Sequence, residues 1–98
     1  MHKTLRYLDF DQCFYINDSF LKFLADIGSA TLRILEMRYL EKITNEGVAK
    51  ILISNMLPSL KQVIVEKCPG LTLNKKDLFE IQMTRKAMNL HSIDTAFD

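Results

Sequence analysis

One pattern of apolar residues recurs three times in this chain and constrains its fold more than any other feature. In LRYLDFDQCFYIND, residues 5–18, apolar or cysteine side chains are spaced by 3, 2, 3 and 3 residues. The same spacing returns 27 residues later in LRILEMRYLEKITN, and 28 residues after that in LKQVIVEKCPGLT. A period of this length is typical of repeat architectures in which each copy is one supersecondary unit. The positions are Leu5, Leu8, Phe10, Cys13 and Ile16, then Leu32, Leu35, Met37, Leu40 and Ile43, then Leu60, Val63, Val65, Cys68 and Leu71.

The spacing predicts a short strand in the middle of each copy, because every second residue there is apolar. A segment with helical spacing follows each strand, so each copy is expected to be a strand, a turn, a helix and a return loop. One such unit cannot bury its apolar side alone, and we therefore expect the copies to stack. The apolar residues expected within these three helical segments are Phe20, Leu21, Leu24 and Ile27, then Val48, Ile51, Leu52 and Met56, then Leu78, Phe79 and Met83.

The predicted fold class is α/β, a solenoid of three strand–turn–helix units with a parallel sheet on its concave face. The units span about residues 5–31, 32–59 and 60–81 within a repeat region of 1–81, and residues 82–98 hold the end of a C-terminal helix and a tail. That helix is expected from about Lys75 to Met88. Asn17-Asp18 and Thr44-Asn45 fall where the first two helices should begin and are expected to cap them.

Composition excludes several classes of function. The chain has 98 residues, of which 48% are hydrophobic and 26% charged, as in an ordinary globular domain. Its net charge of +1 provides no basic field for nucleic acid. No apolar run approaches the roughly 18 residues that a membrane span needs. The segment MHKTLRYLDF has neither a signal-peptide nor a transit-peptide character.

No constellation of residues indicates catalysis, a cofactor or a metal. The two cysteines form no C-x-x-C motif, and no Cys/His cluster is present. Cys13 and Cys68 fill the same slot in the first and third copies, so they should be about 10 Å apart, too far for a disulfide. We expect two reduced, buried thiols. His2 and His91 lie near the two ends of the sequence and are expected to be solvated.

The repeat resembles the cysteine-containing type of leucine-rich repeat, whose consensus is L-x-x-L-x-L-x-x-C-x-x-I-T-D-x-G-L. The second copy's KITNEGV and the third copy's CPGLT carry this resemblance most closely, over about residues 4–81. Within such proteins, the chain resembles a mitochondrial group that comprises ATP synthase coupling factor B and the complex I distal-membrane-arm assembly proteins. The matching elements are Cys13, Tyr15, Ile16, Asp18 and Leu21, then Ile43, Thr44 and Gly47, then Cys68-Pro69-Gly70-Leu71.

That resemblance implies a non-enzymatic protein-interaction module on the matrix side of mitochondria, assisting the assembly or coupling of a respiratory membrane complex. The alternative is a cytoplasmic function as the substrate-recognition repeats of an F-box ubiquitin ligase, since F-box proteins also carry cysteine-containing repeats. The chain contains no F-box, and Cys68 replaces the leucine expected in the mitochondrial group.

The candidate binding site is the concave face of the sheet, where the strand residues that alternate with the core should point outward. In-register stacking would place Asp9, Glu36 and Ile64 side by side, next to a row of Tyr7, Ile34 and Gln62. Exposed apolar residues surrounded by charge suggest a contact surface for a protein partner. The predicted contact residues are Tyr7, Asp9, Asp11, Ile34, Glu36, Arg38, Gln62, Ile64 and Glu66.

The two ends of the array are expected to differ. The helix of residues 75–88 should close the C-terminal end, whereas the first copy begins almost at Met1 and leaves its strand without a cover. An uncovered strand edge is normally protected in native proteins. We therefore expect this edge to dock onto a partner or onto upstream repeats of a longer protein.

Overall fold

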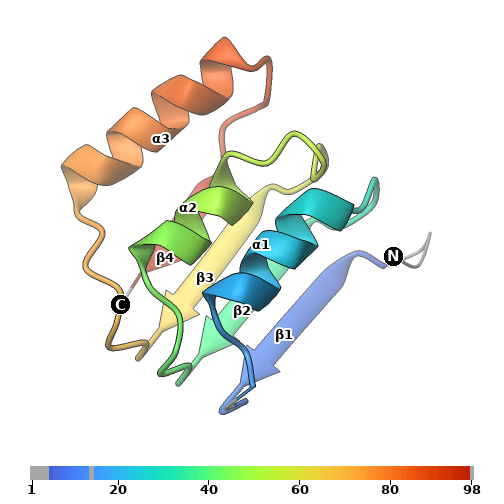
Figure 1. Cartoon of the computed structure of the whole chain (residues 1–98). Helices are drawn as coiled ribbons and strands as arrows, with labels where there is room; N and C mark the ends of the chain where they lie inside the picture. Colours follow the sequence, from blue (N-terminus) through green and yellow to red (C-terminus); the bar gives the residue numbers. More distant parts are fainter. Residues whose placement is uncertain (1–4, 14, 98) are drawn as a thin grey trace.

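The computed structural model describes residues 5–13 and 15–97 and has an α/β architecture with one parallel sheet. The sheet follows chain order, β1-β2-β3-β4, and all three neighbouring pairs are parallel. Helices α1 and α2 lie side by side over one face of the sheet (Figure 1). The face turned away from these helices is called the open face below. The elements are β1 (Tyr7–Asp11), α1 (Asp18–Ile27), β2 (Ile34–Arg38), α2 (Asn45–Leu52), β3 (Gln62–Glu66), α3 (Lys75–Ala87) and β4 (Asp94–Phe97).

The strand register confirms the 27- and 28-residue offsets read from the sequence. Leu8 pairs with Leu35, and Leu35 pairs with Val63. These residues belong to the side of the sheet that faces the helices, where the apolar core forms. The five repeated positions of the second copy are all completely buried: Leu32, Leu35, Met37, Leu40 and Ile43.

The first copy is less well buried than the second because β1 is an edge strand. Leu8 and Phe10 are only partly buried, although they pair with Leu35 and Met37, which are completely buried. The expectation of two buried thiols is met only in part for the same reason. Cys68 is buried, whereas Cys13 is only partly buried, and both are free thiols.

The C-terminal region differs most from the expectation. A fourth strand, β4, forms within the predicted tail and pairs with β3, so the sheet continues past the third copy. Helix α3 has nearly the expected bounds, but Phe79 and Met83 are exposed rather than buried. Its completely buried side chain is Arg85. Ile27 and Met56 are also exposed, because Ile27 ends α1 on the uncovered side and Met56 lies beyond the end of α2.

The helix starts are fixed by polar side chains, one as predicted and one differently. Asn17 caps α1 by accepting from the N–H of Phe20 at 2.9 Å. Thr44 occupies the same position before α2 but makes no cap bond; its hydroxyl and its N–H both donate to Asp18. Asn45, at the start of α2, makes a similar bond to the following segment by accepting from the N–H of Thr72 at 2.8 Å. These bonds tie each helix start to the next segment along the sheet.

Candidate functional site on the open face of the sheet

The predicted contact residues all lie on the open face and form three rows across the strands. The register brings together the residues that the sequence placed side by side, including Asp9, Glu36 and Ile64. Strand β4 adds Asp94 and Ala96, which sequence reasoning missed. The rows are Tyr7, Ile34, Gln62 and Asp94; then Asp9, Glu36, Ile64 and Ala96; then Asp11, Arg38 and Glu66.

Burial distinguishes the residues of this face from one another. Tyr7 is 49% exposed, whereas Ile34 and Ile64 are partly buried by their neighbours. Glu36 lies on the predicted face but is only 8% exposed, so it presents little surface of its own. The cause is its position on a central strand, where it lies between Asp9 and Ile64 and is bonded to Arg38. Glu36 therefore holds the Arg38 guanidinium in place on this face more than it forms an exposed contact of its own.

Arg38 is the centre of charge on the open face. Its guanidinium donates to Glu36 at 2.9 Å, to Glu66 at 3.1 Å and to Asp9 at 3.4 Å, reaching β1, β2 and β3. The bonds to Glu36 and Glu66 raise the pKa of Arg38 above its ordinary value, so the cation is permanent. A planar guanidinium holds several carboxylates in a fixed geometry that a lysine cannot reproduce. Among the described strand residues of this face, Arg38 is therefore the one cation, and it lies among several acids.

Strands β1, β2 and β3 are each followed by a residue with the same unusual backbone conformation. Gln12, Tyr39 and Lys67 follow β1, β2 and β3, and each has a left-handed backbone with φ of 55°, 56° and 55°. This conformation costs roughly 1 kcal/mol for a residue that is not glycine. In return, the N–H of Gln12 donates to the carbonyl of Arg38 at 3.0 Å, and the N–H of Tyr39 donates to that of Glu66 at 3.1 Å. The hydrogen-bond ladder is thus extended while the chain turns away from the sheet.

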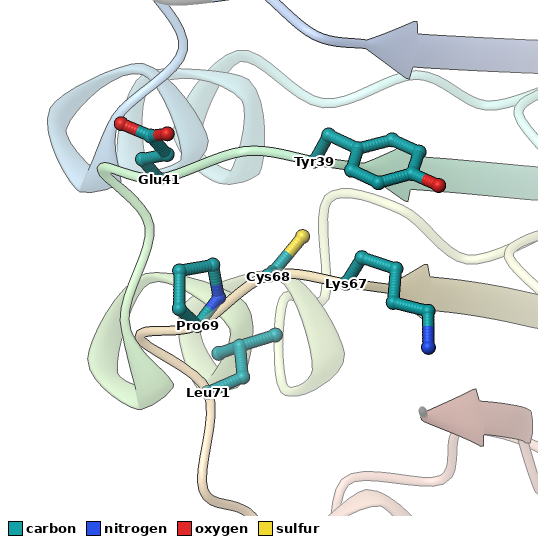
Figure 2. A pocket seen from close by; sticks show the side chains of 6 residues that line it. All are labelled: Tyr39, Glu41, Lys67, Cys68, Pro69 and Leu71. Atoms are coloured by element: carbon teal, nitrogen blue, oxygen red, sulfur yellow. The ribbon is translucent and has the colours of Figure 1, made fainter.

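A pocket of about 530 Å³ lies at this end of β2 and β3 (Figure 2). The Cys68 thiol lies between the turns that carry Tyr39 and Lys67, close to the carbonyl oxygen of Glu66 at 3.4 Å. Burial raises the pKa of Cys68 above its ordinary value, an effect that backbone hydrogen bonds from Leu40 and Tyr39 oppose in part. A protonated thiol is a weak nucleophile and a poor metal ligand. The pocket is lined by Tyr39, Glu41, Lys67, Cys68, Pro69 and Leu71.

His91 is not among the residues that line this pocket. His91 lies at the other end of the strands, where its ring nitrogens are 3.0 Å from the carbonyl of Pro58 and 3.1 Å from that of Ser92. His2, the other histidine, lies outside the described residues. Across residues 5–13 and 15–97, no group of three or more His, Cys, Asp or Glu side chains could hold a metal ion. The same part of the chain contains no helix with the length and hydropathy required to cross a bilayer.

The missed residues carried a weak signal. Ile93, Thr95 and Phe97 alternate with polar or small residues, as in a half-buried strand, and Ile93 is buried. Their offset from β3 is longer than the preceding offsets, because α3 has 13 residues whereas α2 has 8. A search at a fixed period therefore passes over β4.

Comparison of the sequence with protein-family models gave no match, and neither did comparison with curated proteins.

Proposed function

We propose that this chain is a non-enzymatic leucine-rich-repeat module of the cysteine-containing type, which binds a protein partner on the open face of its sheet. The support for the repeat type is that unrelated features recur at the same offsets. The core positions return after 27 or 28 residues, and so do the left-handed residues Gln12, Tyr39 and Lys67. The side chains of Asp18 and Asn45, which each bond to the next segment along the sheet, are also 27 residues apart. Repeat arrays use such faces for binding because side chains from successive units form one continuous surface.

The open face has the composition of a contact surface. Tyr7 and Ile34 are paired at its start. Ile64 lies on the next strand, paired with Glu36 and next to the row that holds Arg38 and Glu66. An apolar centre bordered by charge is the arrangement expected where a partner is desolvated at the middle and oriented at the rim. This juxtaposition is the single observation that carries the proposal.

The more specific proposal is a matrix-side factor that assists the assembly or coupling of a respiratory membrane complex. It rests on the resemblance of the elements around Cys13, Ile43 and Cys68 to the mitochondrial group. One structural relationship connects the first two of these elements. Thr44 donates to Asp18, and Gly47 lies against the same carboxylate, so three of the resembling residues hold adjacent units together.

A capture experiment with matched variants tests the proposal. Tagged wild-type chain and an Ile34→Asp/Ile64→Asp variant are expressed in cells of the source organism, and bound proteins are quantified by mass spectrometry. We expect subunits of a respiratory membrane complex with the wild type and a loss of about tenfold or more with the variant, since central apolar contacts dominate interface energy. Lys76→Asp on exposed α3 is the control and should retain the partner.

The same experiment discriminates the alternatives. Recovery of ubiquitin-ligase adaptors or of cytoplasmic substrates would favour the F-box interpretation instead. Equal recovery by the wild type and the double variant would contradict binding through the open face. Thermal unfolding of both proteins must accompany the capture, because a large fall in melting temperature would show that Ile34 and Ile64 belong to the core.

A further inference from the structure

The uncovered flank of β1 has a structure suited to one kind of ligand. In a parallel sheet, the residues of a strand alternate between bonding to the neighbour on one side and to the neighbour on the other. The N–H of Ile34 donates to the carbonyl of Arg6 at 3.1 Å, and the N–H of Gln12 donates to that of Arg38 at 3.0 Å. Even-numbered residues of β1 therefore bond to β2. The backbone groups of Tyr7, Asp9 and Asp11 point to the flank, where none of the described residues forms a further strand.

Side chains on the helix side of this flank are large and apolar. Phe10 and Phe20 contact each other edge to face, with ring centroids 5.5 Å apart, and both are only partly buried. Phe23 is 57% exposed and Ile27 47% exposed on the adjoining side of α1. A strand added to β1 would cover this cluster with every second side chain.

The equivalent positions of α2 carry smaller or polar side chains. This difference between α1 and α2 indicates which kind of element could pack beside α1 at the flank of β1. Asp18 begins α1 and Asn45 begins α2, so Phe20, Phe23 and Ile27 correspond to Gly47, Lys50 and Ser54. Gly47 and Ser54 allow α2 to approach α1 closely: Gly47 lies against Asp18, and the Ser54 hydroxyl donates to the carbonyl of Ala25 at 2.6 Å. A phenylalanine at position 20 keeps another helix from approaching α1 as closely. The flank therefore fits a lone strand better than another strand–helix unit.

The opposite side of the same strand is acidic. Asp9 and Asp11 are exposed on the open face, and the structure gives Asp9 one shared cation, Arg38, at 3.4 Å. An incoming strand would place its outward side chains directly beside these two carboxylates. Opposite charges at such cross-strand positions stabilise pairing, and like charges oppose it.

We propose that the flank of β1 binds an extended partner segment in which Lys or Arg alternates with large apolar residues. The backbone of the segment pairs with Tyr7, Asp9 and Asp11, its cations face the carboxylates, and its apolar side chains cover Phe10 and Phe20. A second copy of this chain is a poor occupant. Two β1 strands would bring their own Asp9 and Asp11 together, and β4 presents Asp94 and Ala96 on that face rather than cations.

The test uses a fluorescently labelled synthetic peptide that alternates Lys with Val or Leu, titrated with the intact chain and followed by anisotropy. One control peptide carries Glu in place of Lys, and another has the same composition arranged in a Lys block and an apolar block. We expect binding of the alternating peptide alone. In NMR spectra of nitrogen-15-labelled protein, the amides of Tyr7, Asp9 and Asp11 should gain protection from hydrogen exchange when the peptide binds.

Variants identify where the peptide lies. Tyr7→Pro removes an outward-pointing N–H and leaves both carboxylates, and it should weaken binding severalfold. Asp9→Lys/Asp11→Lys should weaken it about tenfold or more, whereas Asp94→Lys at the far edge is the matched charge control and should not. Unchanged binding by the double-lysine variant would overturn the proposal. Loss of peptide binding in the single variant Ile64→Asp would also overturn it, because the peptide would then lie on the open face. Protection of the three amides in a dimer formed without peptide would overturn it as well.

Discussion

Gly47 in the first turn of α2 lies directly against the carboxylate of Asp18 at the start of α1. The same carboxylate accepts hydrogen bonds from the N–H and the hydroxyl of Thr44. The two helix starts are thus held together by one acidic side chain, and the absence of a side chain at Gly47 makes room for it. This contact fixes the spacing between the starts of α1 and α2.

Gly47→Ala is expected to destabilise the protein, in contrast to the usual effect of this change in a helix. Replacing glycine by alanine inside a helix normally gains about 1 kcal/mol. Here the added methyl group would clash with Asp18. We expect the cost of overpacking, about 1–3 kcal/mol, to exceed that gain, so that the free energy of unfolding falls. Urea unfolding measures this quantity directly.

A double-mutant cycle provides the control for that prediction. Asp18→Ala alone should destabilise the chain by removing the bonds to Thr44. Gly47→Ala in the Asp18→Ala background should then cost much less than it does in the wild type. Equal costs in both backgrounds would show that the two residues do not meet.

Arg85→Lys should give the chain a stability that rises with pH. Arg85 is completely buried, and it donates to the carbonyl of Leu52 at the end of α2 and to that of His91 at 3.1 Å. Burial lowers the pKa of Arg85, although arginine stays charged at any ordinary pH. A lysine there should lose one of the two bonds and about 1–3 kcal/mol near neutral pH.

The sign of the pH dependence follows from the same burial. A lysine at position 85 would have a folded-state pKa below its unfolded value, so the unfolded state would bind the extra proton between the two values. Unfolding free energy should then increase, relative to the wild type, as pH rises towards the ordinary lysine pKa of about 10. A flat difference between the two proteins would contradict the burial of Arg85. Lys86→Arg, on the exposed side of α3, is the matched control.

Cys68 should make the protein less stable at alkaline pH. Its folded-state pKa is raised above the ordinary value of 9.0 by burial, so the folded state keeps the proton after the unfolded state has lost it. Stability from this group is complete below about pH 9 and decreases as pH rises above it. The Cys68→Ala variant should be less stable than the wild type at neutral pH. Its free energy of unfolding should, however, decrease less steeply as pH rises above about 9. An unchanged slope would mean that the thiol is accessible in the folded state.

The sequence predicted the sheet register well and the C-terminal region poorly, and the reasons are physical. Positions such as Leu35 and Met37 repeat because they face a shared core, and such repetition can be read directly from the chain. Strand β4 follows a longer helix, so its offset breaks the period. Arg85 was missed because an arginine on a helix normally indicates solvent, and only the tertiary structure places it against Leu52 and His91.

The open face shows a similar division. The identity of its residues followed from the alternation along each strand, together with the register. The burial of Glu36 did not, because it depends on the reach of Arg38 across three strands. The structure was also needed to show that equivalent sides of α1 and α2 have different surroundings. Phe20 of α1 packs against Phe10, whereas Gly47 of α2 lies against Asp18 of α1.

The most direct test of the account is the register between β2 and β3, on which both the open face and its rows depend. In a Cys13→Ala/Cys68→Ala background, Ile34→Cys/Gln62→Cys places two thiols at directly paired positions. Adjacent strands lie about 4.8 Å apart, within the limit of about 7 Å between Cα atoms for a disulfide. We expect this pair to oxidise readily to an intramolecular disulfide, and Ile34→Cys/Ile64→Cys, shifted by two residues, to oxidise far more slowly. Preferential oxidation of the shifted pair, or of neither pair, would contradict the pairing of β2 with β3 in this register.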